Sequence, residues 1–473
     1  MLECAGPNHT HHRLTMKIRR RHFLHLAFAS AAPLGACSSE SSDVTPDADG
    51  SAPPADSGIS GDTGSPDAGG VADVVADAAT PDATAEVCPP GSGNSEMVGP
   101  YWMHLAGDTA LVRFILRGTA GACVNFGEGY TTPATLTSFT DEVEFEWPDP
   151  IFEAPFPDVP GTYTRHEAAI PLGESGLPIP FRIVEQSGAA HEGACPPPPR
   201  GRPIRVAWVA DTMTGIFESV AQRILEQEPD IVIHGGDIQY SANPFDTWLG
   251  FFENLRPVLA KAYFHVCIGN HEFDDYDNDV DEFESMYRRF FDNQTGPGTG
   301  VSHHELRLGQ TSWLLLNSEQ EFENVDGEQH RWMRERIDAA NADPAVAQVI
   351  ACYHRPMWTF GRSFPRPEAR ANVHSVFVEK GVKVAFAGHE HSYQRFLVDG
   401  VNHIVDGGGG ASGYDPDLRL PTYELSFPEE IPLRQTKSRT HGICVVDIAE
   451  DGSIEVFRIT DTGQEVDRFT VGV

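Results

Sequence analysis

From residue 204 onward, short apolar runs alternate with longer amphipathic stretches, and this alternation constrains the fold more than any other feature. Apolar runs at 204–211, 231–237 and 263–270 are separated by helical stretches. The pattern continues to residue 389 and includes a helix expected over 368–381. It predicts an α/β domain with a largely parallel sheet covered by helices. The segment 442–460 then returns to paired strands around an Asp-Gly turn. We expect a β-sandwich flanked by helices, in αββα layers.

The preceding region, residues 87–200, has a different pattern. Its sequence alternates apolar and polar residues between turn formers, without a helical period. This predicts a small antiparallel β-sandwich of the fibronectin-III-like kind, ahead of a catalytic domain over 201–473. The run CPPPPRGRP at 195–203 indicates a stiff linker between them.

The N-terminus has the features of an export signal. Translation is expected to start at Met16, and the alternative is that residues 1–15 are a disordered extension. A basic patch, a short apolar run and the motif Leu34-Gly35-Ala36-Cys37 follow. The run is too short to span a bilayer. This order of a basic patch, an apolar run and a Cys-terminated motif is typical of a bacterial signal peptide over 1–37 with a lipobox. In such a peptide, Cys37 becomes the acylated N-terminus. Arg20-Arg21 favours twin-arginine export, with Sec export as the alternative.

Residues 38–86 form a Ser/Asp/Ala/Pro-rich acidic segment without Lys or Arg. Such a segment cannot bury enough surface to fold, so we expect a disordered linker. The expected location is the periplasmic or outer face of a membrane, anchored through Cys37.

The formal net charge of -35 argues against nucleic acid as a partner, because this surface repels phosphodiester backbones. No protein partner is evident. Export permits disulfides, and Cys88, Cys123 and Cys195 flank the predicted small sandwich, so a pair among them is expected. Cys267 and Cys352 lie in apolar runs and are expected to be buried thiols.

Metal-ligand residue types stand at the end of five predicted strands. In α/β sheets, ligands bind outside the carboxyl ends of strands. Each residue alone has an ordinary structural explanation, such as a cap or a hydrogen-bonded imidazole, but together they predict a site for Fe, Zn or Mn. The five strand ends carry Asp211, Gly236-Asp237 with Tyr240, Gly269-Asn270-His271-Glu272, Tyr353-His354 and Gly388-His389-Glu390-His391.

This order resembles the calcineurin-like metallophosphoesterases. Tyr240 in Gly236-Asp237-Ile238-Gln239-Tyr240, together with GHEHSYQR and YHRPMW, is similar to the purple acid phosphatase branch. The resemblance covers residues 99–473 and is specific only over the catalytic domain. It implies two metal ions, with Asp237 shared between them. The first is held by Asp211, Asp237, Tyr240 and His391, and the second by Asp237, Asn270, His354 and His389.

Met213 stands where the wider family has a histidine ligand and the purple branch usually has glycine. Tyr240 would fill that ligand position, and a phenolate favours Fe(III) there. The second ion would then be Zn, Mn or Fe(II). We interpret Met213 as a packing residue.

The resemblance further implies an acid phosphatase that acts on phosphomonoesters outside the cytoplasm by attack of a metal-bound hydroxide. His271 would donate a proton to the leaving oxygen and Glu272 would orient His271. The stretch after His354 lacks the substrate-contacting histidines of plant members, so Arg362 or Arg366 is a candidate phosphate clamp, or a surface or linker arginine. Two alternatives stay open: a phosphodiesterase or nucleotidase on the same site, and a non-catalytic surface-binding protein.

Overall fold

The computed structural model describes most of the chain after residue 96, and all the described residues belong to the unit Val74–Val473. None of their helices is long and apolar enough to cross a membrane. The expected leader, the Cys37 anchor, the 38–86 linker and Tyr240 lie outside the described residues. The described residues are 88, 97–105, 109–119, 121–143, 161–173, 176–199, 201–213, 217–238, 245–272, 291, 303–320 and 322–473.

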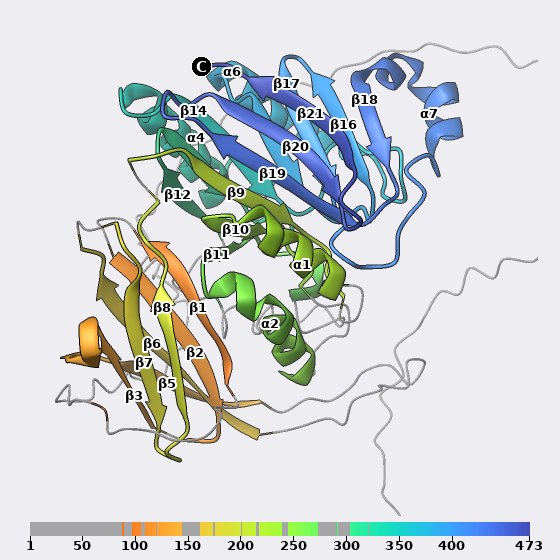
Figure 1. Ribbon diagram of the computed structural model, residues 1–473. Coiled ribbons are helices and arrows are strands. Elements are labelled where there is room, and N and C mark those ends of the chain that lie inside the picture. Colours follow the sequence, from red (N-terminus) through yellow and green to blue (C-terminus); the bar gives the residue numbers. More distant parts are fainter. Residues whose placement is uncertain are drawn as a thin grey trace, which may run out of the picture. The chain divides into compact units, whose positions relative to one another are not determined.

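Two four-stranded antiparallel sheets come first along the chain, drawn in orange and yellow in Figure 1. The sheets face each other: the rings of Trp102 and Phe181, one from each sheet, lie 4.9 Å apart. Antiparallel strands with one buried face would account for the alternating pattern of the sequence. Residues 111–116, however, are all buried, so the strand that contains them is covered on both faces. One sheet has the order β1 (Val98–Leu105), β2 (Thr109–Arg117), β6 (Gly161–Pro171), β5 (Thr137–Val143); the other has β4 (Thr132–Pro133), β3 (Ala122–Phe126), β7 (Ile179–Glu185), β8 (Ala190–Cys195).

A disulfide joins Cys88 to Cys123, while Cys195 is a buried free thiol. Cys267 and Cys352 are buried free thiols too, as expected from the apolar runs that contain them.

A six-stranded sheet carries the first three ligand-bearing strands side by side. These three strands, β9 to β11, run parallel, and the C-terminal strands extend the sheet antiparallel from β9. The order is β11 (Tyr263–Val266), β10 (Ile231–His234), β9 (Ile204–Val209), β19 (Gly442–Ile448), β20 (Ile454–Thr460), β21 (Glu465–Val471).

A seven-stranded sheet carries the other two ligand-bearing strands, β14 and β15. These lie next to each other in a parallel run of four strands, β13-β14-β15-β17. The full order is β12 (His304–Leu308), β13 (Thr311–Leu315), β14 (Gln348–Tyr353), β15 (Val384–Ala387), β17 (Val401–Asp406), β16 (Tyr393–Val398), β18 (Arg434–Ser438).

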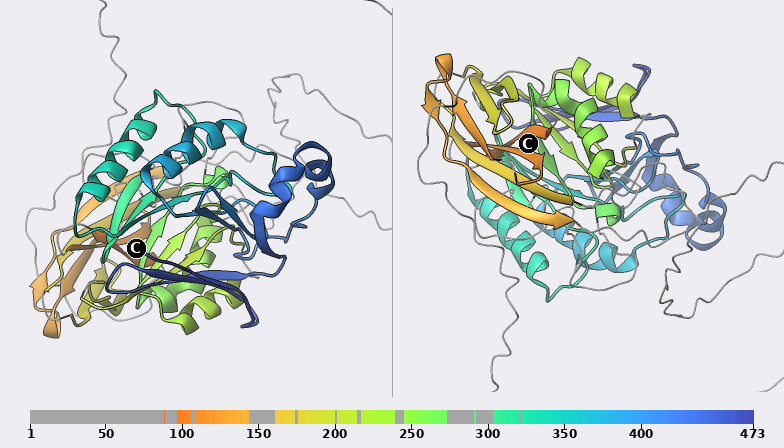
Figure 2. Two further views of the ribbon diagram at one scale, coloured as in Figure 1. Left: turned by 90° about the horizontal axis from the view of Figure 1, so that it is seen from above. Right: turned by 90° about the horizontal axis from the view of Figure 1, so that it is seen from below.

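Three apolar cores hold this region in four layers. Between the sheets, Trp208 of β9 stacks on Phe386 of β15 with ring centroids 5.2 Å apart. A second core packs helices α1 (Phe217–Gln227) and α2 (Phe245–Leu259) on the six-stranded sheet. A third packs α4 (Glu328–Ala342) and α6 (Ser375–Lys380) on the seven-stranded sheet. Figure 2 shows the green and teal helices on opposite sides of the strands. The αββα architecture predicted from the sequence is confirmed.

The single helix expected over 368–381 is divided into three parts. It consists of α5 (Pro367–Ala369), a π-helical segment (Arg370–His374) and α6. The π-helical segment contains the buried His374. Helix α7 (Leu420–Ser426) and a 3₁₀ segment (Pro428–Leu433) precede β18.

Candidate metal centre

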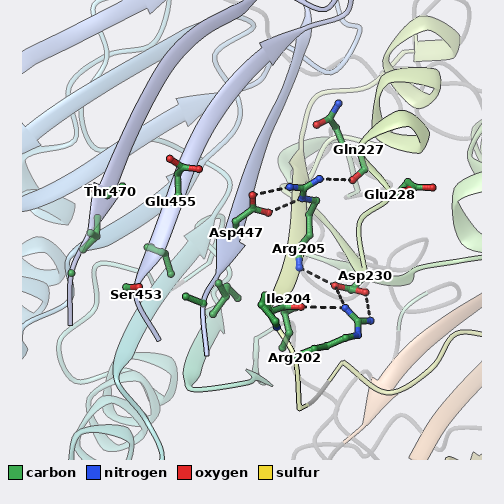
Figure 3. A pocket seen from close by; sticks show the side chains of 16 residues that line it. Arg202, Ile204, Arg205, Gln227, Glu228, Asp230, Asp447, Ser453, Glu455 and Thr470 are labelled. Atoms are coloured by element: carbon green, nitrogen blue, oxygen red, sulfur yellow. Dashed lines mark hydrogen bonds and ion pairs between the residues drawn. The ribbon is translucent and has the colours of Figure 1, made fainter. Parts of the chain in front are cut away.

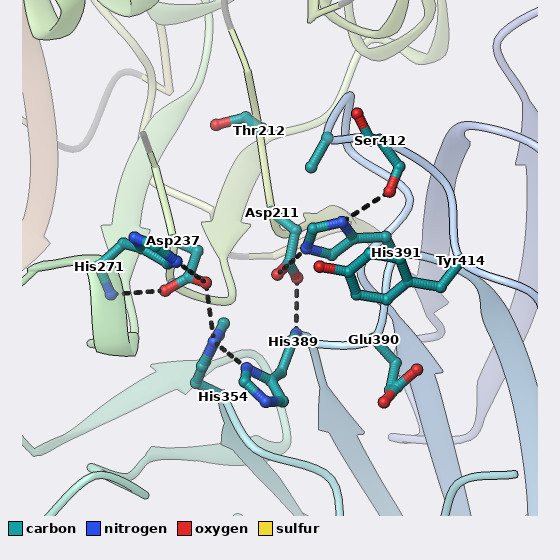
Figure 4. Close-up of polar contacts among 12 residues, drawn as sticks. Asp211, Thr212, Asp237, His271, His354, His389, Glu390, His391, Ser412 and Tyr414 are labelled. Carbon is teal, nitrogen blue, oxygen red and sulfur yellow. Dashed lines mark hydrogen bonds and ion pairs between the residues drawn. The ribbon is translucent and has the colours of Figure 1, made fainter. Parts of the chain in front are cut away.

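The structure brings together the six described residues that the sequence proposed as metal ligands. They come from both sheets, because the carboxyl ends of the parallel strands of each sheet meet at the same edge. Figure 4 shows the side chains of Asp211, Asp237, His354, His389 and His391 converging on one region. Asp211 follows β9, Asp237 follows β10, Asn270 follows β11, His354 follows β14, and His389 and His391 follow β15.

Four of these residues direct ligand atoms at one point. His354 Nε2 lies 3.2 Å from Asp237 Oδ2, 3.2 Å from Asn270 Oδ1 and 3.2 Å from His389 Nδ1. The ligand atoms of Asp237, His354 and His389 all lie within 4.8 Å of one another. Two imidazole nitrogens with carboxylate and amide oxygens are a donor set that suits a divalent transition metal.

The other two ligands lie beside this cluster. Asp211 Oδ1 is 3.5 Å from His391 Nε2, and Asp211 Oδ2 accepts a hydrogen bond of 2.7 Å from the backbone N–H of His389. Tyr240, which the resemblance assigns to the same ion, is not among the described residues.

Backbone carbonyls fix the orientation of two imidazoles. Nδ1 of His354 lies 2.8 Å from the carbonyl oxygen of Gly235, and Nδ1 of His391 lies 2.8 Å from that of Ser412. When Nδ1–H donates to a carbonyl, Nε2 keeps its lone pair, which is the tautomer that binds a metal. Both Nε2 atoms face the carboxylates, so the donor set fits a pair of cations.

Three of the ligands have a strained backbone. Asp211, Asp237 and His389 have φ values of 61°, 54° and 67°, in the left-handed region that non-glycine residues seldom adopt. Such strain persists only where surrounding contacts impose it, and it concentrates at functional sites. Gly388 is part of this packing, because a Cβ added there would lie 2.6 Å from Asp211 Oδ2.

The charges at the site support each other. Burial alone would lower the pKa of the His354 imidazole, but the adjacent Asp237 carboxylate raises it to about 10. Burial would raise the pKa of Asp237, but His354, His271 and His389 hold it below the usual aspartate range. The site therefore stabilises an ionised carboxylate beside a positive charge, which a metal cation would supply.

His271 lies at the mouth of the cluster rather than within it. Its side chain is 21% exposed and its Nε2 is 3.9 Å from Asp237 Oδ2. Its backbone N–H donates to Asp237 Oδ1 at 2.9 Å, which fixes its position beside this ligand. The imidazole lines the adjacent cavity, where it can reach a bound molecule.

Glu272 differs from its predicted role of orienting His271. Its carboxylate is fully buried and accepts hydrogen bonds from the backbone N–H groups of Asp237 (2.9 Å), Ile238 (2.7 Å) and Gly269 (2.6 Å). These groups belong to the two loops that carry Asp237 and Asn270. Glu272 therefore acts as a positioning residue for the ligand loops.

The cavity beside the cluster has a volume of about 760 Å³ and is lined by Asp237, Asn270, His271, His389 and His391. Arg362 and Arg366, the proposed phosphate clamps, both line it. Arg366 is paired with Glu323 at 2.8 Å, whereas Arg362 donates to the hydroxyl of Tyr414 at 2.8 Å.

Three further residues of the site have no assignment from the sequence. Nη1 of Arg355 lies 3.1 Å from Nε2 of His389. Tyr414 stacks on His391 with ring centroids 3.9 Å apart, as Figure 4 shows. Glu390 is buried and accepts hydrogen bonds from the backbone N–H groups of Arg362 and Ser363. In the sequence, Arg355 directly follows His354, and Glu390 lies between His389 and His391, so both positions pointed to the site. Nothing in the sequence pointed to Tyr414.

Another hollow, of about 680 Å³, opens at the edge of the six-stranded sheet (Figure 3). Its arginines are neutralised: Arg205 pairs with Asp447 at 2.6 Å, and Arg202 pairs with Asp230. Its lining contains neither histidine nor cysteine. This hollow therefore lacks the imidazole ligands that are found beside Asp237.

Known proteins share this domain. The family model for calcineurin-like phosphoesterases matches residues 204–393. Probable purple acid phosphatase 20 of Arabidopsis thaliana is 23% identical over 282 residues, which cover 56% of this chain and 64% of that protein. Probable inactive purple acid phosphatase 9 of the same plant is 26% identical over 199 residues, 36% of this chain and 30% of that protein.

A third relative, a nucleotide pyrophosphatase/phosphodiesterase of Hordeum vulgare, is 25% identical over 242 residues, 42% of this chain and 61% of that protein. The chain thus spans less than two thirds of the length of each of these three relatives. Among solved structures, a purple acid phosphatase from yellow lupin seeds superposes with a TM-score of 0.64 at 17% identity, covering 80% of this chain and 74% of that one. Residues 204–393 therefore form a calcineurin-like phosphoesterase domain that has purple acid phosphatases among its homologues.

Proposed function

We propose that this chain hydrolyses phosphate esters, chiefly monoesters, with two metal ions at the strand-end site. The observation that carries the proposal is the convergence of Asp237, Asn270, His354 and His389 on one point beside a cavity that also contains His271. Bound cations would supply the Lewis acidity that activates water and neutralises phosphoryl charge. The donor set, the fixed tautomers and the buried carboxylates support this assignment.

The protein side chains have separate tasks in this proposal. Asp237 would hold both ions, and its negative charge would screen their mutual repulsion. His271 faces the cavity and donates a proton from Nε2 to the leaving oxygen. Glu272 holds the loops of Asp237 and Asn270 at a fixed separation through three backbone N–H bonds.

The test is a metal analysis of the purified protein, together with assays on p-nitrophenyl phosphate and bis(p-nitrophenyl) phosphate. We expect two metal ions per chain and faster hydrolysis of the monoester, in the acid range. A fully metal-loaded protein that hydrolyses neither ester contradicts the proposal and favours the non-catalytic alternative.

A second candidate is a phosphodiesterase or nucleotidase on the same site. The cavity of about 760 Å³ gives room for a group larger than a phosphoryl group. The similarity to the Hordeum vulgare nucleotide pyrophosphatase/phosphodiesterase also favours it. Faster turnover of the bis-ester than of the monoester would select this candidate.

The proposed identity of the first ion is Fe(III), bound by Asp211, Asp237, Tyr240 and His391. A phenolate bound to Fe(III) absorbs visible light by charge transfer, so the iron-loaded protein is expected to be violet or pink. Tyr240→Phe should remove this absorption band and leave the circular dichroism unchanged. A colourless wild type with full iron occupancy contradicts the Tyr240 assignment, but not the hydrolase proposal.

The proposed location is outside the cytoplasm, with the chain anchored through an acylated Cys37. The motivation is the basic, apolar and lipobox order of residues 17–37. Cys37→Ala should move the protein from the membrane fraction to the soluble fraction. An unmodified mature N-terminus well beyond Cys37, found by mass spectrometry, contradicts the anchor.

A further inference from the structure

Four arginines line the cavity beside the metal cluster. The whole chain has a net charge of -35, so these four positive side chains form a local group whose charge is opposite to that of the molecule. Such a concentration raises the affinity of a cavity for anions although the whole molecule repels them. The four are Arg355, Arg362, Arg366 and Arg419.

Two of these arginines are neutralised by carboxylates of the same cavity. Arg355 pairs with Glu319 at 2.7 Å, and Arg366 pairs with Glu323 at 2.8 Å. Binding a phosphate with either guanidinium would compete with an ion pair that already exists. These two arginines therefore add little net positive charge to the cavity.

The other two arginines have no carboxylate within ion-pair distance among the residues that the structure describes. Arg362 donates from Nη1 to the Tyr414 hydroxyl at 2.8 Å. Arg419 donates from Nε to the backbone carbonyl of Arg362 at 2.6 Å, and its guanidinium lies 3.6 Å above the ring of Phe364. Neutral partners orient both side chains and leave two full positive charges on one wall.

This wall has a fixed position relative to the metal ligands. The Tyr414 ring stacks on His391 with an interplanar angle of 13°, and the Arg362 guanidinium lies 5.0 Å above the Tyr414 ring. One aromatic ring thus separates Arg362 from a metal ligand. The buried Glu390 carboxylate, between ligands His389 and His391, holds the backbone N–H of Arg362 at 2.9 Å.

We propose that Arg362 and Arg419 form a second anion subsite, and that the substrate carries a second phosphate group next to the phosphate that is cleaved. This inference rests on the proposed phosphoester hydrolysis and names its substrate class, compounds with a terminal diphosphate. Water adds to the terminal phosphorus, and the bond from that phosphorus to the bridging oxygen breaks. His271 gives a proton to the departing phosphate, which Arg362 and Arg419 hold by charge-assisted hydrogen bonds, and the proton lost by the water replaces the one that His271 gave.

The test compares AMP with ADP, because both carry the same nucleoside and only ADP leaves a phosphate for the second subsite. We expect the metal-loaded wild type to have a higher kcat/KM for ADP. Arg362→Ala and Arg419→Ala should each lower kcat/KM for ADP by at least about 10-fold, the effect of losing one hydrogen bond to a charged group. Their kcat/KM for AMP should fall less than their kcat/KM for ADP, because AMP leaves no phosphate for the second subsite.

Two arginine variants serve as controls. Arg366→Ala removes a neutralised cation from the same cavity, and Arg331→Ala removes an exposed one on α4. Neither should change the ratio of the ADP and AMP values. A loss of ADP preference in Arg366→Ala equal to that in Arg362→Ala overturns the assignment of the subsite to Arg362 and Arg419.

A second measurement does not depend on turnover. Methylenediphosphonate carries two phosphonate groups on a bridge that resists hydrolysis, and inorganic phosphate provides one anionic group. In the wild type, calorimetry should show tighter binding of the diphosphonate, and this advantage should disappear in Arg362→Ala and Arg419→Ala. Equal affinities for the two anions in the wild type overturn the subsite.

The outcomes separate the two proposals. If the wild type hydrolyses neither p-nitrophenyl phosphate, AMP nor ADP, the proposed function fails. If AMP and p-nitrophenyl phosphate are hydrolysed, but the ADP to AMP ratio is the same in the wild type and both variants, only the second subsite fails. Parallel loss of AMP and ADP hydrolysis in folded variants also overturns it, because the arginines would then serve the cleaved phosphate.

Discussion

Among the buried imidazoles that the structure describes after residue 204, two clusters contrast, and only the first of these two has the form of a metal site. In the first, His354 and His389 meet around the Asp237 carboxylate, and His391 faces Asp211. Both carboxylates are buried, and the rings of His354 and His391 are held from behind by backbone carbonyls.

The second cluster is a chain of hydrogen bonds. His403 Nε2 lies 3.0 Å from His374 Nδ1, the Tyr353 hydroxyl lies 3.3 Å from His403 Nδ1, and His374 Nε2 lies 3.3 Å from Asp399 Oδ2. The imidazole nitrogens of His374 and His403 are hydrogen-bonded to each other and to the Tyr353 hydroxyl. The one carboxylate, Asp399, has a side chain that is 70% exposed.

The pKa values of the two clusters differ accordingly. Asp237 overcomes burial and raises the pKa of His354 to about 10. Burial lowers the pKa of His403 well below the usual histidine value, and neighbouring His374 and Arg370 lower it further. The number of imidazoles is therefore a poor guide to a cation site. Buried carboxylates with converging lone pairs distinguish the site that would bind metal.

The largest expected effect comes from removing the carboxylate that distinguishes the first cluster. Asp237→Asn keeps a residue that tolerates the left-handed backbone but removes the shared anion. Hydrolysis of p-nitrophenyl phosphate should fall by more than about 10³-fold, the upper range for one lost electrostatic contact in an active site. Elemental analysis should show fewer than two metals per chain. Full metal content with wild-type turnover would contradict the shared-ligand role.

A smaller loss is expected from His271→Ala, which removes an imidazole that is close to the first cluster without belonging to it. The rate should fall by about 10²–10⁴-fold, the usual contribution of a general acid. Both metals should be retained, as measured on the same sample. Loss of metal in this variant would mean that His271 is itself a metal ligand and belongs to the first cluster.

The smallest effect is expected in the second cluster and concerns stability. Burial lowers the pKa of His403 in the folded state, so the unfolded chain binds the extra proton. The contribution of the neutral His403 imidazole to the unfolding free energy is fully present above the ordinary histidine pKa, about 6.5. This contribution is lost as the pH falls below that value. His403→Gln should reduce this pH slope of the unfolding free energy by at most about 1.4 kcal/mol per pH unit.

The measurement for His403 is urea unfolding at a series of pH values between 5 and 8, in the wild type and the variant. Metal content and hydrolysis near neutral pH should be unchanged, which serves as the control. A variant that loses metal would show that the second cluster also contributes to the cation site.

The fold was predictable from the sequence wherever the hydrophobic period was strong. The runs that became β9, β10 and β14 are buried on both faces and read as continuous apolar stretches, which single out parallel strands. The break of the 368–381 helix was not predictable, because the π-helical turn at Arg370–His374 depends on packing that the period does not contain.

The candidate ligands were predictable for a similar local reason: each follows directly after an apolar strand. Roles that depend on contacts distant in sequence were not. Glu272 is adjacent to His271, but two of its three partners are the backbone N–H groups of Ile238 and Asp237, which lie 34 and 35 residues away. Arg362 and Arg366 look alike in sequence, and only the position of Glu323 distinguishes the neutralised arginine from the other.

The position of Glu390 has a consequence for how this protein could diverge from its relatives. Its carboxylate holds the cavity wall through backbone N–H groups of Arg362 and Ser363, which every amino acid except proline possesses. The side chains at positions 362 and 363 can therefore change while these backbone contacts persist and the candidate ligands keep their places. Under the proposed function, single substitutions at these two positions can alter substrate preference and leave the candidate metal ligands in place.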